Sequence, residues 1–89
     1  MIFFGPADFA HSLGLAHDMG NPKVAEARRR VAEVARKHGK IAGTVGSTAN
    51  LKELYDMGYR FVNLGADVVA LGQYFTKIAD DAKAIRDSL

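Results

Sequence analysis

The sequence predicts an α/β fold in which three strand–helix units follow one another and their strands lie parallel in one sheet. Apolar runs with β-branched or aromatic side chains occur at residues 1–4, 40–45 and 59–65, as in buried strands. A segment with helical signals follows each run after a connection of a few residues. Alternating strands and helices with short connections favour a parallel sheet. Three such strands leave two sheet edges unpaired, so we expect copies of the chain to associate.

The first strand leads directly into a turn that carries an acid. Gly5 and Pro6 end the apolar run, and Asp8 stands just past its carboxyl end. Ligands of parallel α/β sheets bind at this edge, because loops and helix N-termini converge there. Pro6 in the first turn of a helix loses no hydrogen bond, whereas the amides of Ala7, Asp8 and Phe9 stay free to meet an anion. Asp8 is therefore a candidate ligand-binding residue, with helix capping as the alternative.

A long amphipathic helix is expected over residues 22–38. Asn21 is suited to be its N-cap, Pro22 its first residue and Gly39 the left-handed residue that ends it. Charged residues, including three consecutive arginines at 28–30, are expected on a solvated face. Apolar residues recur at steps of three and four and form a stripe that packs on the sheet: Val24, Ala27, Val31, Val34 and Ala35.

The second strand opens into a glycine-containing turn for which two interpretations stand. Residues 43–48 read Gly-Thr-Val-Gly-Ser-Thr, and such a run between a strand and a helix can cradle a phosphate on free amides. Ser47 or Thr48 is also suited to be the N-cap of a helix over residues 49–57, and no lysine follows at the position that a phosphate-binding loop uses. Capping is the favoured interpretation.

The third strand is followed by a last helix over residues 68–88. Asp67 is expected to be its N-cap, with ligand contact as the second interpretation. A wide apolar stripe needs partners on more than one side, and this supports a homo-oligomer. The stripe comprises Val68, Val69, Ala70, Leu71, Phe75, Ile78, Ala79, Ala82 and Ile85.

Composition argues against several classes of partner. The formal net charge of +2 and the pI near 9.1 are too mild to indicate nucleic acid. No apolar stretch approaches the roughly 20 residues of a membrane span. The sequence has no cysteine, which excludes disulfides and thiolate metal sites and fits the cytoplasm. His11 and His17 do not share a helical face, so we expect no joint metal site there.

Several motifs in order resemble the HpcH/HpaI family of pyruvate aldolases, which is related to citrate lyase β subunits. They are Phe-Gly-Pro-Ala-Asp-Phe at 4–9, Ser-Leu-Gly at 12–14, Asn-Pro-x-Val at 21–24, Gly-Lys-Ile-Ala-Gly at 39–43 and Met-Gly-Tyr-Arg-Phe-Val-Asn-Leu-Gly-Ala-Asp at 57–67. The resemblance implies the C-terminal part of a (β/α)₈ TIM barrel, with residues 1–89 as a single fragment of one domain. A whole barrel takes about 250 residues, so we expect a longer parent protein.

The resemblance also implies a chemistry. Family members are carbon–carbon lyases that cleave or form 2-keto-3-deoxy or 4-hydroxy-2-oxo acids through a metal-stabilised pyruvate enolate, with a 2-oxo acid and an aldehyde as substrates. By position Asp8 matches a ligand of the divalent metal, Mg²⁺, Mn²⁺ or Co²⁺. Gly5, Ala7 and Asp8 match the binding site of the substrate carboxylate, and Val45 matches an apolar pocket position.

The family's second metal carboxylate, its arginine and its histidine align before Met1, so we expect the 89-residue chain alone to be inactive. Phe9 and Ala10 stand where leucine and serine are common in the family, so the specificity for the aldehyde substrate stays open. The competing interpretation is a non-catalytic piece, either an oligomerising βα module or a phosphate-binding fragment that uses residues 43–48.

Overall fold

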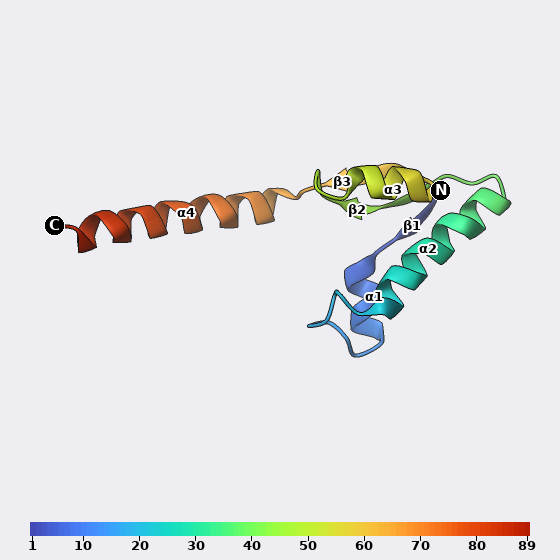
Figure 1. Cartoon of the computed structure of the whole chain (residues 1–89), viewed down its shortest axis with the longest axis horizontal. Coiled ribbons are helices and arrows are strands. Elements are labelled where there is room, and N and C mark those ends of the chain that lie inside the picture. The colour runs from blue at the N-terminus through green and yellow to red at the C-terminus, as the bar shows by residue number, and fades with distance from the viewer.

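A computed structural model describes all of residues 1–89 and contains one three-stranded sheet (Figure 1). The strands are ordered β1-β2-β3 and all pairs are parallel, which confirms the predicted α/β fold. Helices follow each strand, so the chain consists of consecutive βα units. The elements in chain order are β1 (Ile2–Phe4), α1 (Pro6–Ser12), α2 (Pro22–Lys37), β2 (Ala42–Gly46), α3 (Leu51–Met57), β3 (Tyr59–Leu64) and α4 (Asp67–Asp87).

The two faces of the sheet differ in their cover. Ile2, Ala42 and Val62 belong to a cluster that packs against α2 and α3, because alternate side chains of a strand point to the same face. Phe3 and Phe61 point to the other face, where no helix lies, and are 45% and 51% exposed. The prediction of a fully buried first strand is therefore wrong: only its helix-covered face is buried, since no second layer covers the other.

Two small clusters make up the core. The first joins α2, β2, α3 and β3 through Ala32, Ala35, Ala42, Leu54 and Tyr59. The second joins β1, α1 and α2 through Phe4, Ala10 and Val24. Only 11 of the 89 residues are buried, so tight packing is confined to the sheet and the helices α1, α2 and α3.

Both ends of α2 follow the sequence prediction. The side chain of Asn21 accepts a hydrogen bond from the amide of Lys23 at 2.9 Å, which makes Asn21 the N-cap. At the other end Gly39 has a left-handed φ of 65°. The amides of Gly39 and Lys40 then donate to the carbonyls of Arg36 and Ala35, at 3.2 and 2.8 Å. This pair of bonds is the Schellman motif that glycine favours.

Two predicted caps are wrong. Neither Ser47 nor Thr48 caps α3; the N-cap position is Asn50. The Asn50 side chain turns back and accepts a hydrogen bond from the Ser47 amide at 2.8 Å, so residues 47–50 form a turn before the helix begins.

At α4 the N-cap is Ala66, in extended conformation, and Asp67 is already the first helical residue. The carboxylate of Asp67 accepts a bond from the Val68 amide at 2.7 Å. A negative charge in the first helical turn is favourable because the N-terminal end of the helix is positive.

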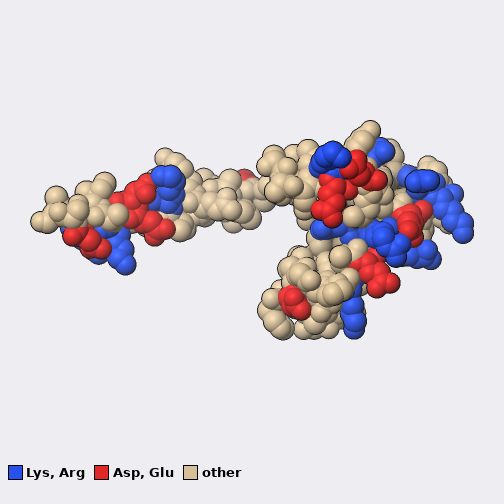
Figure 2. Space-filling model, viewed as in Figure 1, with Lys and Arg blue, Asp and Glu red and all other residues tan.

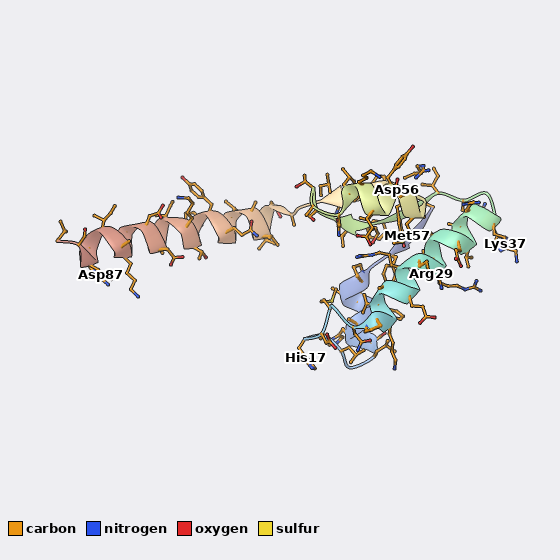
Figure 3. All side chains as sticks on the ribbon, in the orientation of Figure 1. His17, Arg29, Lys37, Asp56, Met57 and Asp87 are labelled. Atoms are coloured by element: carbon orange, nitrogen blue, oxygen red, sulfur yellow. The ribbon has the colours of Figure 1, made fainter.

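The last helix α4 projects away from the sheet (Figure 1). It contains no buried residue, and it gives the chain extents of 62 × 27 × 19 Å. Side chains point into solvent all along it, out to Asp87 near its end (Figure 3). The expected apolar stripe is present, but no surface of the same chain covers it. None of the helices combines the length and the apolar character that crossing a membrane requires.

Candidate functional site

The carboxyl ends of β1 and β2 bring the predicted site residues to one edge of the sheet. Phe4, the last residue of β1, is paired with Thr44 in β2. Gly5 follows Phe4 in the chain and Val45 follows Thr44, so both residues lie at this edge. Asp8 follows in the first turn of α1. The parallel register thus brings Gly5, Asp8 and Val45 from two separate segments to one edge. Ala7, the fourth predicted site residue, precedes Asp8 in the same turn.

The carboxylate of Asp8 lies over Gly5. A Cβ atom placed on Gly5 would be 3.0 Å from Oδ2 of Asp8, which is closer than ordinary van der Waals contact. Glycine at this position therefore leaves the room that the carboxylate occupies. Asp8 itself is exposed, so its oxygens are accessible to a ligand at the strand end.

The first turn of α1 offers unpaired amides next to this carboxylate. Gly5 is the N-cap residue, and the first intrahelical bond runs from the Phe9 amide to the Gly5 carbonyl at 2.9 Å. No side chain caps the helix, and Pro6 has no amide hydrogen to satisfy. The amides of Ala7 and Asp8 precede the first intrahelical donor and have no partner within the helix. Asp8 is the third helical residue and caps nothing, so the capping interpretation of Asp8 is wrong.

Thr44 fixes the point at which β1 leaves the sheet. Its hydroxyl donates a hydrogen bond to the carbonyl of Phe4 at 2.9 Å, and the side chain is completely buried. This bond ties β2 to the residue immediately before Gly5, so it holds the turn that carries Asp8. Sequence reasoning missed Thr44. A hydroxyl inside an otherwise apolar strand was the available signal, because a buried polar group needs a partner.

Val45 adds an apolar wall at the strand ends. It is 38% exposed and alternates with the buried Thr44, so it points away from the helix-covered face. The same face carries Phe3 and Phe61, whose rings meet edge to face with centroids 6.4 Å apart. The site therefore combines a polar turn with an apolar floor.

The glycines of β2 serve packing. A Cβ on Gly43 would come within 2.9 Å of the Phe3 ring, and one on Gly46 within 2.6 Å of Leu54 and 3.0 Å of Val62. Both positions lie within the strand rather than in a loop. Their small size is explained by neighbouring side chains, so the glycine spacing gives no support to the phosphate-binding interpretation.

Other ionisable groups do not form a cluster around Asp8. No group of three or more His, Asp or Glu residues is arranged to hold a metal ion. His17 lies in the loop beyond α1, well away from α4 (Figure 3). Basic and acidic side chains are mixed over the visible face (Figure 2). Among the residues described, Asp8 is thus a single carboxylate rather than part of a complete metal site.

Tyr59 is the first residue of β3, at the opposite edge of the sheet, and its contacts indicate a structural role. Its hydroxyl donates to the carbonyl of Arg28 at 2.6 Å. Burial raises the pKa of the Tyr59 phenol above its ordinary value, and the nearby Arg28 charge partly opposes this shift. The neutral phenol is therefore the form that the fold accommodates.

Known proteins that resemble this chain are aldolases. The hydroxypyruvate/pyruvate aldolase of Paraburkholderia phytofirmans is 41% identical over 69 residues, which cover 76% of this chain and 26% of that protein. The 5-keto-4-deoxy-D-glucarate aldolase of Klebsiella pneumoniae is 31% identical over 83 residues, covering 92% and 32%. This chain thus spans about a third or less of the length of these relatives.

A solved structure has the same arrangement of elements. The HpcH/HpaI aldolase/citrate lyase family protein from Burkholderia cenocepacia J2315 superimposes with a TM-score of 0.76 at 32% identity, over 91% of this chain and 32% of that one. This share is more than residues 1–66 can supply, so the superposition includes part of α4. The family model for HpcH/HpaI aldolase/citrate lyase matches residues 1–73. The chain therefore belongs to the HpcH/HpaI aldolase/citrate lyase family.

Proposed function

We propose that a complete barrel containing this chain cleaves or forms the carbon–carbon bond of 2-keto-3-deoxy or 4-hydroxy-2-oxo acids. The observation that carries this proposal is the Asp8 carboxylate over Gly5, beside unpaired amides at the carboxyl end of β1. The two relatives described above are named as a hydroxypyruvate/pyruvate aldolase and a 5-keto-4-deoxy-D-glucarate aldolase, which supports carbon–carbon lyase chemistry. The absence of cysteine fits a reducing compartment, and the cytoplasm is the location that we propose.

Each predicted residue has a role in the proposed reaction. The amides of Ala7 and Asp8 bind the carboxylate of the 2-oxo acid, because unpaired N–H groups in a first helical turn attract an anion. Gly5 leaves space for this approach. Val45 contacts the apolar part of the substrate and limits water at the strand ends. These contacts fix the 2-oxo acid in one orientation, which lowers the entropic part of the barrier.

Asp8 fits one ligand position of a hard divalent cation. Carboxylate oxygens are the ligands that Mg²⁺ and Mn²⁺ prefer, and the Asp8 oxygens are exposed at the strand end. This chain supplies one carboxylate, so the remaining ligands of the cation come from substrate, water and strands outside residues 1–89. When bound, the cation supplies positive charge that stabilises the negative charge developing on the 2-oxo acid.

A chimeric enzyme tests this proposal. The chain replaces the matching segment of the Klebsiella 5-keto-4-deoxy-D-glucarate aldolase, so that the remaining strands come from a relative. We expect cleavage of 5-keto-4-deoxy-D-glucarate in the presence of Mn²⁺ or Mg²⁺. Asp8→Asn removes an anionic ligand but little volume, and should lower the rate by on the order of 10²-fold or more.

Ser47→Ala is the matched control, because it truncates a polar side chain in the neighbouring strand-end loop. Its hydroxyl lies 3.4 Å from Asn50 Oδ1 and has no assigned ligand role. Oxalate binding by calorimetry should depend on the cation and on Asp8 but change little in Ser47→Ala. A folded Asp8→Asn chimera with near-normal activity would remove Asp8 from the mechanism. A folded chimera without activity would contradict the proposed role of the whole segment.

A further inference from the structure

Asn63 is the one polar side chain on the uncovered face of the three strands. Alternate residues of a strand point to the same face, and Phe61 points to the face where no helix lies, so Asn63 points there as well. Arg60, near the start of β3, instead stacks its guanidinium on the Tyr55 ring of α3. An amide in this row is not explained by packing, because its neighbours on the face are apolar or lack a side chain. These neighbours are Phe3, Gly43, Val45 and Phe61.

Asn63 lies at the edge of the sheet that carries Asp8. The register pairs Asn63 with Val45 in β2, and Val45 in turn stands beside Gly5, because the residues just before them in the two segments are paired. From the usual spacing of strands, Asn63 is about 5 Å from Val45 and about 10 Å from Gly5, measured across the sheet. The row Gly5, Val45, Asn63 therefore leads from the proposed carboxylate site, across the apolar wall, to a polar side chain.

The Asn63 amide has no partner among residues 1–89. The side-chain hydrogen bonds at this edge join Thr44 to the Phe4 carbonyl and the Ser47 amide to Asn50, and Asn63 takes part in neither. In a (β/α)₈ barrel the helices form the outer ring, so the helix-free face that carries Asn63 is the interior. Because buried polar groups are almost always hydrogen-bonded, the amide needs a partner inside the barrel, at the end where substrates bind.

We propose that Asn63 selects the aldehyde-derived half of the substrate by hydrogen bonding to a hydroxyl group on it. This inference rests on the proposed function, in which the amides of Ala7 and Asp8 hold the 2-oxo acid and Val45 contacts its apolar part. With the carboxylate of the substrate at β1 and its carbon chain against β2, the far half of the substrate lies at β3. Asn63 is the polar side chain that β3 presents there.

The chemistry of an amide fits a hydroxyl group. An asparagine side chain both donates and accepts hydrogen bonds, as a hydroxyl does, so each group can satisfy the other. The row contains no Lys or Arg, the residues that form the strong contacts to a charged group. A site that hydrogen-bonds a hydroxyl discriminates strongly against an analogue without it, since the buried amide is then left unpaired. Asn63 thus favours hydroxylated aldehydes over alkyl aldehydes of the same size.

Aldol addition by the chimera described above tests this inference. Pyruvate is combined with glycolaldehyde or with propanal, in which a methyl group replaces the hydroxyl. Asn63→Leu keeps the side-chain volume but removes the polar atoms, and should lower the ratio of kcat/KM for glycolaldehyde to kcat/KM for propanal by about tenfold or more. Thr48→Val is the matched control, because it removes a polar group at the same edge but on the α3 side of the sheet, and it should leave the ratio unchanged. Asn63 is exposed in this chain, so Asn63→Leu should fold, as circular dichroism can verify.

Binding measurements separate this inference from the proposed function. Oxalate has no aldehyde-derived half, so it should bind equally to the original chimera and to Asn63→Leu. In a folded chimera without turnover, calorimetry replaces kinetics: 5-keto-4-deoxy-D-glucarate should bind about tenfold or more tightly than 2-oxoadipate, which has the same carbon chain without the hydroxyls, and Asn63→Leu should remove this difference.

Three results would each overturn the role of Asn63 while leaving that of Asp8 in place: an unchanged discrimination in Asn63→Leu, an equal loss of kcat/KM for both aldehydes, or weaker oxalate binding in Asn63→Leu. A folded chimera that binds neither oxalate nor the two acids would overturn the proposed function, and this inference with it.

Discussion

Replacement of Gly46 by alanine tests whether the glycines of β2 serve packing. Gly46 lies at the end of β2, directly under α3. A Cβ atom there would be 2.6 Å from Cδ1 of Leu54, 3.0 Å from Cγ1 of Val62 and 3.0 Å from Oδ1 of Asn50. Leu54 is only 1% exposed, so it has no free space into which to move. Gly46→Ala must therefore push α3 away from the sheet or force Leu54 out of its preferred rotamer.

The expected cost is about 1–3 kcal/mol in the free energy of unfolding, the range for an added methyl group in a packed core. For a domain of this size, about 1 kcal/mol corresponds to roughly 4–8 °C in Tm. Urea unfolding followed by circular dichroism measures the change. Gly20→Ala is the control, because a Cβ there meets nothing within 4 Å and the residue has no positive φ. It should leave stability within about 0.5 kcal/mol of the original.

The same experiment with inorganic phosphate separates packing from phosphate binding. A ligand that binds only the folded state raises the free energy of unfolding. We expect excess phosphate to leave the stability of the original chain and of Gly46→Ala unchanged. Gly46→Ala as stable as Gly20→Ala would refute the packing argument. Stabilisation of the original chain by phosphate, lost in Gly46→Ala, would revive the phosphate-binding interpretation.

Two further changes probe the sheet. Thr44→Val removes the buried hydrogen bond to the Phe4 carbonyl and should lower the free energy of unfolding by about 0.5–1.5 kcal/mol in urea unfolding, whereas Thr44→Ser, which keeps the hydroxyl, should lose less. Because burial raises the pKa of Tyr59, its contribution to stability is complete below the ordinary phenol pKa of about 10 and falls as pH rises through the raised value. Unfolding measured on both sides of about pH 10 should show this decline, and its persistence in Tyr59→Phe would assign it to another group.

The strands and the site edge could be predicted because their signals are local. Each apolar run is a continuous short segment, and the Gly5–Pro6 turn and Asp8 lie within a few residues of the end of the first run. Parallel pairing follows from the alternation of strands and helices. The N-cap at Asn21 was predictable for the same reason, since proline at the next position leaves little choice of helix start.

The features that the sequence did not reveal depend on contacts or on competition between neighbours. Asn50 and Ser47 are both good caps, and only the bond from the Ser47 amide back to Asn50 decides between them. Thr44 matters because its hydroxyl meets a carbonyl 40 residues away in the chain. The apolar stripe of α4 was visible, but its direction depends on the conformation of Gly65 and Ala66.

The uncovered face of the sheet constrains the side chains of strands outside this chain. Phe3, Gly43 and Phe61 occupy paired positions on the three strands, so large and small residues alternate across the row. In a closed eight-stranded barrel, four inward side chains from alternate strands fill one layer. Phe3 and Phe61 then supply half of such a layer. Because interior volume is filled at nearly constant density, two aromatic rings here leave less volume for the side chains at the two remaining positions.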